Sequence, residues 1–164
     1  MIFIGIDPGT RTLGFSVINF DEEVGSMTLL SSGILKFDKN KTLAEKLLFT
    51  YDTFFEYIDK YKVKYEKVSI VIEKQYIDKN PHSAFCLISS RTIFMLLSQK
   101  LNVEYVELEP TVIKKVVSGN GSADKEKIIS SLKFYFEGLS LESYDEADAI
   151  ACALSAALNF KKKN

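Results

Sequence analysis

The run from Val68 to Ile72 constrains the fold of this chain more than any other feature. Four of its five residues are β-branched and aliphatic, and only Ser69 interrupts them. A run without the regular polar alternation of a half-exposed strand is typical of a central strand buried on both faces. Such a strand needs helices on both sides of its sheet, so an α/β architecture is expected.

The rest of the chain supplies the other strands and helices. Three N-terminal strands are predicted to form an antiparallel meander, over residues 2–6, 13–20 and 27–37. Helices, recognised by apolar residues at three- and four-residue steps, are predicted at 42–64, at 81–100, after Pro110, at 124–136 and at 144–160. A last strand at 103–108 follows a helix and is predicted to pair in parallel. The expected fold is therefore a five-stranded mixed sheet, three antiparallel strands then two parallel, flanked by helices.

Length and composition place the chain among ordinary globular domains. It has 164 residues, 46% of them hydrophobic, and 21 basic against 22 acidic side chains give a formal charge of −1. A chain of this size can bury a core without disulfides or a structural metal, so a single domain over residues 1–164 is expected. The near-neutral charge disfavours a protein that coats nucleic acid nonspecifically, but five lysines gather between residues 114 and 133.

The two cysteines and the apolar N-terminus bear on where the chain works. Cys86 and Cys152 lie in apolar stretches and are predicted to be small core residues, with neither a disulfide framework nor zinc-ligand spacing. The N-terminal run meets Asp7 too early for a signal-peptide core, and no stretch approaches the ~20 apolar residues that span a membrane. A reducing cytosol and no membrane partner are expected.

Carboxylates stand at the ends of otherwise apolar elements: Asp7, Glu73, and the pair Asp145 and Asp148. A carboxylate removed from water needs a cation or hydrogen-bond donors to compensate for its lost hydration. All-oxygen ligands select Mg²⁺ or Mn²⁺, and two such ions about 3.5–4 Å apart are the arrangement used for phosphodiester hydrolysis. Taken singly, Asp7 would also fit a turn, and Asp145 would also fit a helix N-terminus.

The spacing at the start of the last predicted helix separates its acids. Asp145 and Asp148 are three residues apart and share one face, whereas Glu146 is rotated away by about a hundred degrees. Small residues behind the pair are predicted to let this helix lie close to the sheet: Ala147, Ala149, Ala151 and Ala153.

Five short blocks follow one another along nearly the whole chain: Ile4–Phe15, Val71–Tyr76, Asn80–Ala84, Gly119–Lys125 and Asp145–Ala149. Together they resemble the RuvC family of Holliday-junction resolvases. The resemblance implies an RNase H-like fold, a homodimer, and Mg²⁺-dependent nicking of four-way DNA junctions. It also implies two metal ions in each site, with Mn²⁺ able to substitute.

The resemblance assigns the chemistry of the site to named residues. Asp7, Glu73, Asp145 and Asp148 become the catalytic and metal-binding acids. Lys125 matches a lysine near the active site, where a cation can hold the scissile phosphate or stabilise developing charge. A solvated helix face is the other interpretation of this lysine.

The same resemblance gives a set of DNA-binding residues: Tyr76, Lys114, Arg11 and Lys115. Tyr76 takes the place of an aromatic residue that stacks on a base near the cut, with core packing as its alternative. His82 is predicted to belong to a helix start, with a phosphate contact as the alternative. The helix at 81–100 is the predicted dimer surface, with Ile93 at an outward position, and complete burial of this helix in the monomer core is the alternative.

Two other functions fit parts of the sequence. The segment from Asp7 to Thr12 also resembles the phosphate-binding hairpin of actin-like and sugar-kinase ATPases, although those folds need two such domains. A noncatalytic junction-binding protein would not need all four acids. The sequence therefore predicts a structure-selective endodeoxyribonuclease that acts on branched DNA in the cytoplasm of a bacterial cell or phage host.

Overall fold

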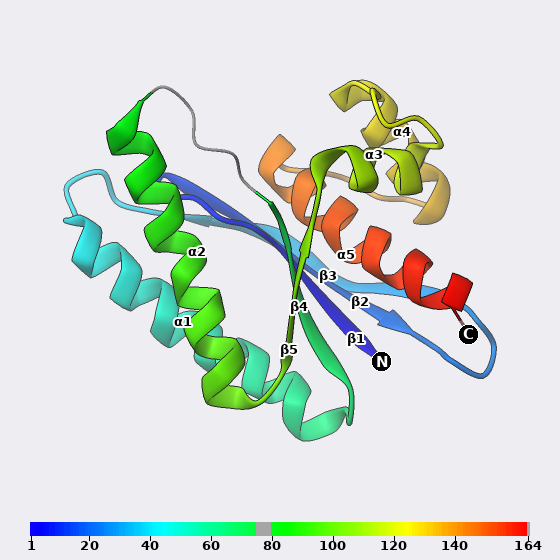
Figure 1. The fold of residues 1–164 in the computed structure, drawn as a ribbon, viewed down its shortest axis with the longest axis horizontal. Coiled ribbons are helices and arrows are strands. Elements are labelled where there is room, and N and C mark those ends of the chain that lie inside the picture. Colours follow the sequence, from blue (N-terminus) through cyan, green and yellow to red (C-terminus); the bar gives the residue numbers. More distant parts are fainter. Residues whose placement is uncertain (75–79, 164) are drawn as a thin grey trace.

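One five-stranded sheet lies at the centre of the computed structural model, which describes residues 1–74 and 80–163 (Figure 1). Its strands are β1 (Ile2–Asp7), β2 (Thr12–Phe20), β3 (Met27–Lys36), β4 (Val68–Glu73) and β5 (Glu104–Leu108). The order across the sheet is β3-β2-β1-β4-β5. β1, β2 and β3 pair antiparallel, whereas β4 runs parallel to β1 and β5 parallel to β4. The predicted mixed sheet is confirmed.

Helices cover both faces of the sheet. They are α1 (Leu43–Lys64), α2 (Pro81–Leu101), α3 (Pro110–Ser118), α4 (Lys125–Tyr135) and α5 (Tyr144–Lys163). Figure 1 shows α1 and α2 on one face and α5, with α3 and α4 beyond it, on the other. Residues of β4 divide between the two cores, since Ile70 and Ile72 pack with the α1 and α2 side and Val71 with the α5 side. The strand is buried on both faces, as its composition predicts.

Local sequence signals define the ends of the helices. Thr42 and Glu45 form a capping box at the start of α1. The Asn80 side chain accepts hydrogen bonds at the start of α2, where Pro81 occupies the first turn. Asp124 caps α4 by accepting from the Lys127 backbone N–H. These signals place the helix ends within a few residues of the predicted ones.

α5 lies unusually close to β1 and β2. A Cβ atom added to Gly5 would stand 2.0 Å from the carbonyl oxygen of Ala149, and one added to Gly14 would stand 2.0 Å from that of Asp145. Ser16 Oγ donates a hydrogen bond to the Ala149 carbonyl at 2.9 Å. Small residues on both elements therefore fix the start of α5 against the sheet, as predicted.

The prediction that both cysteines lie in the core is wrong for one of them. Cys152 is fully buried in α5, but Cys86 is partly exposed on α2, with its Sγ 3.8 Å from His82 Nε2. Residues 81–89, the first two and a half turns of α2, include no buried residue, and the first buried one is Ser90. Apolar composition in this segment therefore does not produce burial. No helix in the described ranges is both long and apolar enough to cross a lipid bilayer.

Candidate active site

Asp7 and Glu73 end two neighbouring parallel strands. Ile6 of β1 pairs with Ile72 of β4, so the next residue of each strand lies at the same edge of the sheet. Both isoleucines pack in the core under α1 and α2. Because side chains alternate along a strand, Asp7 and Glu73 face the opposite side, toward α5.

Asp145 and Asp148 come to the same edge from the first turns of α5. The Thr12 hydroxyl donates a hydrogen bond to Asp145 Oδ2, which ties this carboxylate to β2. Asp148 Oδ2 lies 3.7 Å from the ammonium of Lys125, the first residue of α4. The structure thus brings the four predicted acids to one edge of the sheet.

The four carboxylates act on one another electrostatically. Burial, followed by the charges of Asp148, Asp145 and Glu73, raises the pKa of Asp7 to about 8. Burial also raises the pKa of Glu73, and the Asp148 carboxylate adds to this effect. The pKa of Asp148 is raised mainly by burial as well. Crowded, partly desolvated acids of this kind gain stability from a cation placed among them.

Lysines provide part of that positive charge. Lys125 lowers the pKa values of Asp7, Glu73 and Asp148, opposing the effect of burial. Lys114 on α3 acts in the same direction on Glu73 and Asp148. Both lysines line a hollow of about 180 Å³, here called the lysine-side hollow, together with Glu73, Asp124 and Asp148.

A second hollow borders the other two acids. It measures about 560 Å³ and is here called the arginine-side hollow, lined among others by Asp7, Arg11, His82, Ser83 and Asp145. Two of the acids thus line each hollow. A chain-like ligand that lay along both hollows would contact Lys114 and Lys125 on one side of the acids. On the other side it would contact Arg11 and His82.

The remaining predicted site residues fall in different places. Lys115 is exposed on α3 and is not among the residues that line either hollow. Tyr76 lies outside the described residues. Glu146 is absent from the acid cluster: only 3% exposed, it accepts hydrogen bonds from Ser32 Oγ at 2.6 Å and from the Glu142 backbone N–H at 2.7 Å. Its rotation away from Asp145 and Asp148 is as predicted.

The donor set of the cluster suits a hard divalent cation. Its side chains offer carboxylate oxygens only, which Mg²⁺ and Mn²⁺ prefer, and their mutual repulsion would be relieved by a dication. Within residues 1–74 and 80–163, no three Asp, Glu, His or Cys side chains are already gathered as closely as ligands of one ion. The acids of the cluster, Asp7, Glu73, Asp145 and Asp148, are the residues that could hold such an ion.

Sequence reasoning missed two side chains of this site. Thr12 bonds to Asp145, and the ring of Tyr144 lies 4.8 Å from the ammonium of Lys125. Thr12 carries no local signal, since its partner is 133 residues away in the chain. Tyr144 stands directly before Asp145. An aromatic residue at a helix start, next to several acids, is the sequence signal that could have identified it as part of the site.

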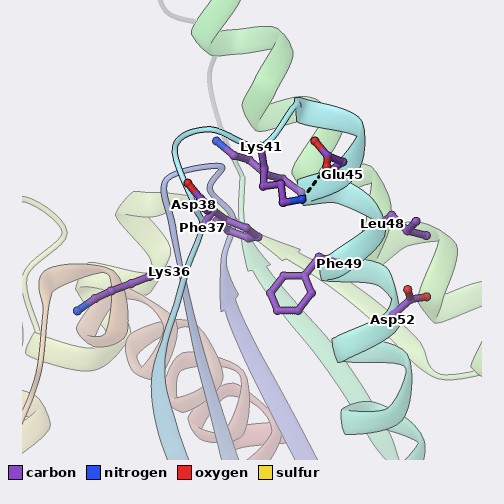
Figure 2. Close-up of a pocket in the computed structure, with 9 residues that line it drawn as sticks. Lys36, Phe37, Asp38, Lys41, Glu45, Leu48, Phe49 and Asp52 are labelled. Atoms are coloured by element: carbon purple, nitrogen blue, oxygen red, sulfur yellow. Dashed lines mark hydrogen bonds and ion pairs between the residues drawn. The ribbon is translucent and has the colours of Figure 1, made fainter.

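The apolar hollow in Figure 2 lies on the other layer of the molecule. It measures about 520 Å³ and is formed by the end of β3 and the first turns of α1, with Phe37 and Phe49 in edge-to-face contact. Its Lys41 and Glu45 form an ion pair at 2.8 Å, and Glu45 also belongs to the capping box of α1. These two charged residues therefore stabilise the helix start, and the acid cluster described above lies elsewhere.

Comparison with known proteins shows the family of this chain. The family model described as crossover junction endodeoxyribonuclease RuvC matches residues 3–156. A crossover junction endodeoxyribonuclease RuvC of Bdellovibrio bacteriovorus is 31% identical over 163 residues, which cover 99% of this chain and 94% of that protein.

Solved structures share the fold. Thermus thermophilus RuvC superimposes with a TM-score of 0.85 at 21% identity, covering 99% of this chain and 97% of that one. T. thermophilus RuvC in complex with a Holliday junction substrate gives a TM-score of 0.84 at 18% identity, with 99% and 96% covered. The fold and the acid cluster define an RNase H-like protein with a carboxylate-rich sheet edge. The chain belongs to the RuvC family.

Proposed function

We propose that this protein is a Mg²⁺-dependent, structure-selective endonuclease that resolves four-way DNA junctions by paired nicks. The observation that carries the proposal is the meeting of four acids from β1, β4 and α5 at one sheet edge. Membership of the RuvC family supports the substrate class, because relatives are named crossover junction endodeoxyribonucleases. It gives no support to the alternative of an actin-like nucleotide-binding domain.

Asp7, Glu73, Asp145 and Asp148 would hold two Mg²⁺ ions, with Mn²⁺ as a substitute. When bound, such ions polarise a phosphate and make a water molecule a stronger nucleophile at neutral pH. Thr12 fixes the orientation of Asp145 by its hydrogen bond. The close packing of α5 against Gly5 and Gly14 fixes the position of Asp145 and Asp148 relative to the strands.

Cationic side chains would bind and stabilise the DNA backbone at the cut. Lys125, beside Asp148, is placed to stabilise charge that develops on the phosphate, and Lys114 to contact the strand from the same hollow. Arg11 would hold the strand in the arginine-side hollow. Lys115 is proposed as an outer phosphate contact and Tyr76 as the residue that stacks on a base.

A homodimer would place two such sites on one junction. Large apolar side chains on the outer face of α2 are exposed and form a stripe along it: Phe85, Ile88, Met95 and Leu96. This stripe supports α2 as the isologous contact. Ile93 is not part of it, because that residue packs partly buried against the core under α1 and α2. The prediction that Ile93 points outward is therefore wrong, and Ile88 is the better probe.

The substrate class is tested by incubating the protein with a synthetic four-way junction, a three-way branch, linear duplex and an RNA–DNA hybrid, with Mg²⁺ or with EDTA. We expect paired nicks in opposed strands of the four-way junction, in Mg²⁺ only, leaving 5′-phosphate ends that ligase can seal. Junction binding without cleavage in Mg²⁺ would instead indicate a noncatalytic binder. Preferential hybrid cleavage would indicate an RNA-directed hydrolase. We also propose that the protein acts in the cytoplasm of a bacterial cell or phage host, where chromosomal or phage junctions form.

A further inference from the structure

The ammonium of Lys125 is held between two partners. It lies 4.8 Å from the centroid of the Tyr144 ring and 3.7 Å from Asp148 Oδ2. The lysine side chain is 62% exposed, and a single ion pair at such a site restrains a flexible side chain weakly. An aromatic face on the other side adds a cation–π contact, so the ring narrows the positions that the ammonium can occupy.

The ring itself is anchored from both of the helices that meet here. Tyr144 is the first residue of α5, directly before Asp145, whose carboxylate is bonded to Thr12. Its hydroxyl donates a hydrogen bond to Glu126 Oε1 of α4 at 3.2 Å. The ring thus bridges the start of α5, which carries two of the acids, and the start of α4, which carries Lys125.

The position of Tyr144 is unusual for a residue with a purely structural role. It is 49% exposed and is not part of either hydrophobic core. Its ring is instead in contact with the Lys125 ammonium, which acts electrostatically on Asp7, Glu73 and Asp148 alike.

We propose that Tyr144 is a positioning residue that holds the Lys125 ammonium over the acid cluster. This inference rests on the proposed function, in which Lys125 stabilises charge at the scissile phosphate. Tyr144 acts through the lysine and does not touch the DNA. The ring makes the contact with the ammonium, and the exposed hydroxyl bond to Glu126 adds only a small part of the anchoring, because the cation–π contact needs only the aromatic face.

The test is single-turnover cleavage of a four-way junction in Mg²⁺, with junction binding measured separately in EDTA. We expect Tyr144→Leu to slow cleavage about fivefold to tenfold with an unchanged Kd, and Tyr144→Phe to stay within about twofold of the wild type. In a Lys125→Met background, Tyr144→Leu should cause no further loss, since its partner is already gone. Phe134→Leu, at an exposed aromatic residue of α4 outside both hollows, is the matched control and should cut at the wild-type rate.

Three results would overturn the inference. Wild-type cleavage by Tyr144→Leu would show that the ring does not position the lysine, and the proposed function would stand. Weaker junction binding by Tyr144→Leu, with further loss of cleavage in the Lys125→Met background, would show that the ring contacts DNA directly. An inactive wild-type protein would end the proposed function, and this inference with it.

Discussion

The Asp7 carboxylate makes the stability of the metal-free protein depend on pH. Burial and three neighbouring acids raise its pKa to about 8 in the folded protein, whereas an unfolded chain releases this proton near about pH 4. Between these two values the folded state binds a proton that the unfolded state does not. The metal-free protein therefore loses stability as the pH rises from about 4 to about 8, and this contribution is constant above that.

Asp7→Asn should remove this penalty. In EDTA we expect the variant to melt above the wild type at about pH 8, with a smaller difference at about pH 5. Mg²⁺ should raise the Tm of the wild type more than that of the variant, because the variant has lost a charged ligand. Differential scanning fluorimetry measures both effects. A variant that melts lower at pH 8 in EDTA, or an equal Mg²⁺ shift in both proteins, would contradict the electrostatic description of the cluster.

The lysines of the lysine-side hollow should affect catalysis more than a lysine elsewhere. Lys125→Ala and Lys114→Ala should each lower the single-turnover rate about tenfold or more, because a positive charge near the phosphate is lost. Lys133→Ala, at an exposed position on α4 outside both hollows, is the control and should cut normally. Equal rates for all three variants would leave both lysines without a role in the reaction.

For single residues, the sequence predicts the acids of the site better than it predicts the side chains that hydrogen-bond to them. Asp7 and Glu73 stand out because a charge at the end of a buried strand requires compensation. The bond from Thr12 to Asp145 and the bond from Ser32 to Glu146 depend on how α5 lies across β2 and β3. No local pattern encodes such a contact. The stacking role of Tyr76 stays a prediction.

Among the elements, α5 and β2 determine where Asp145 and Asp148 lie, which are two of the four acids. Gly14 leaves no space between its backbone and the carbonyl of Asp145. Gly14→Ala should therefore push the start of α5 outward, lower the stability by about 1–3 kcal/mol and reduce cleavage as well. Gly121→Ala is the comparison, since its Cβ would stand 3.3 Å from the Thr111 carbonyl, which is tight but needs a shift of only a few tenths of an ångström, and it should cost less. A Gly14→Ala protein with the wild-type Tm and rate would show that the close approach is not needed.

Element boundaries follow from the sequence where a chemical signal marks them. The capping residues Thr42, Asn80 and Asp124 and the apolar periodicity define the helices. Where β2 pairs with β3, Val17 pairs with Ser31 and Ile18 with Leu29, so that Leu30 of β3 has no partner in β2. The serines and Gly33 that follow Leu30 are a weak point of this strand, but the residue at which the register shifts is set by pairing with the neighbouring strand.

For the whole molecule, the exposed stripe on α2 determines assembly in the proposed function. Ile88→Glu should give a folded monomer that binds junctions poorly and makes single nicks, because a buried charge at an isologous contact is repeated in both subunits. Light scattering at micromolar concentration measures the mass. Val63→Glu, at an 82% exposed position on α1, should leave the dimer intact. A wild-type protein that is monomeric both alone and on junction DNA would contradict the dimer.

Glu73→Gln tests most directly whether the carboxylate cluster cuts the junction. This substitution removes one charged ligand at nearly constant volume, and Glu137→Gln at an exposed position after α4 is the matched control. The measurement is the cleavage rate of a bound four-way junction in Mg²⁺, together with its Kd in EDTA. We expect Glu73→Gln to bind like the wild type and to cut at least about 100-fold more slowly, while Glu137→Gln cuts normally. Cleavage by Glu73→Gln at the wild-type rate would place the chemistry elsewhere.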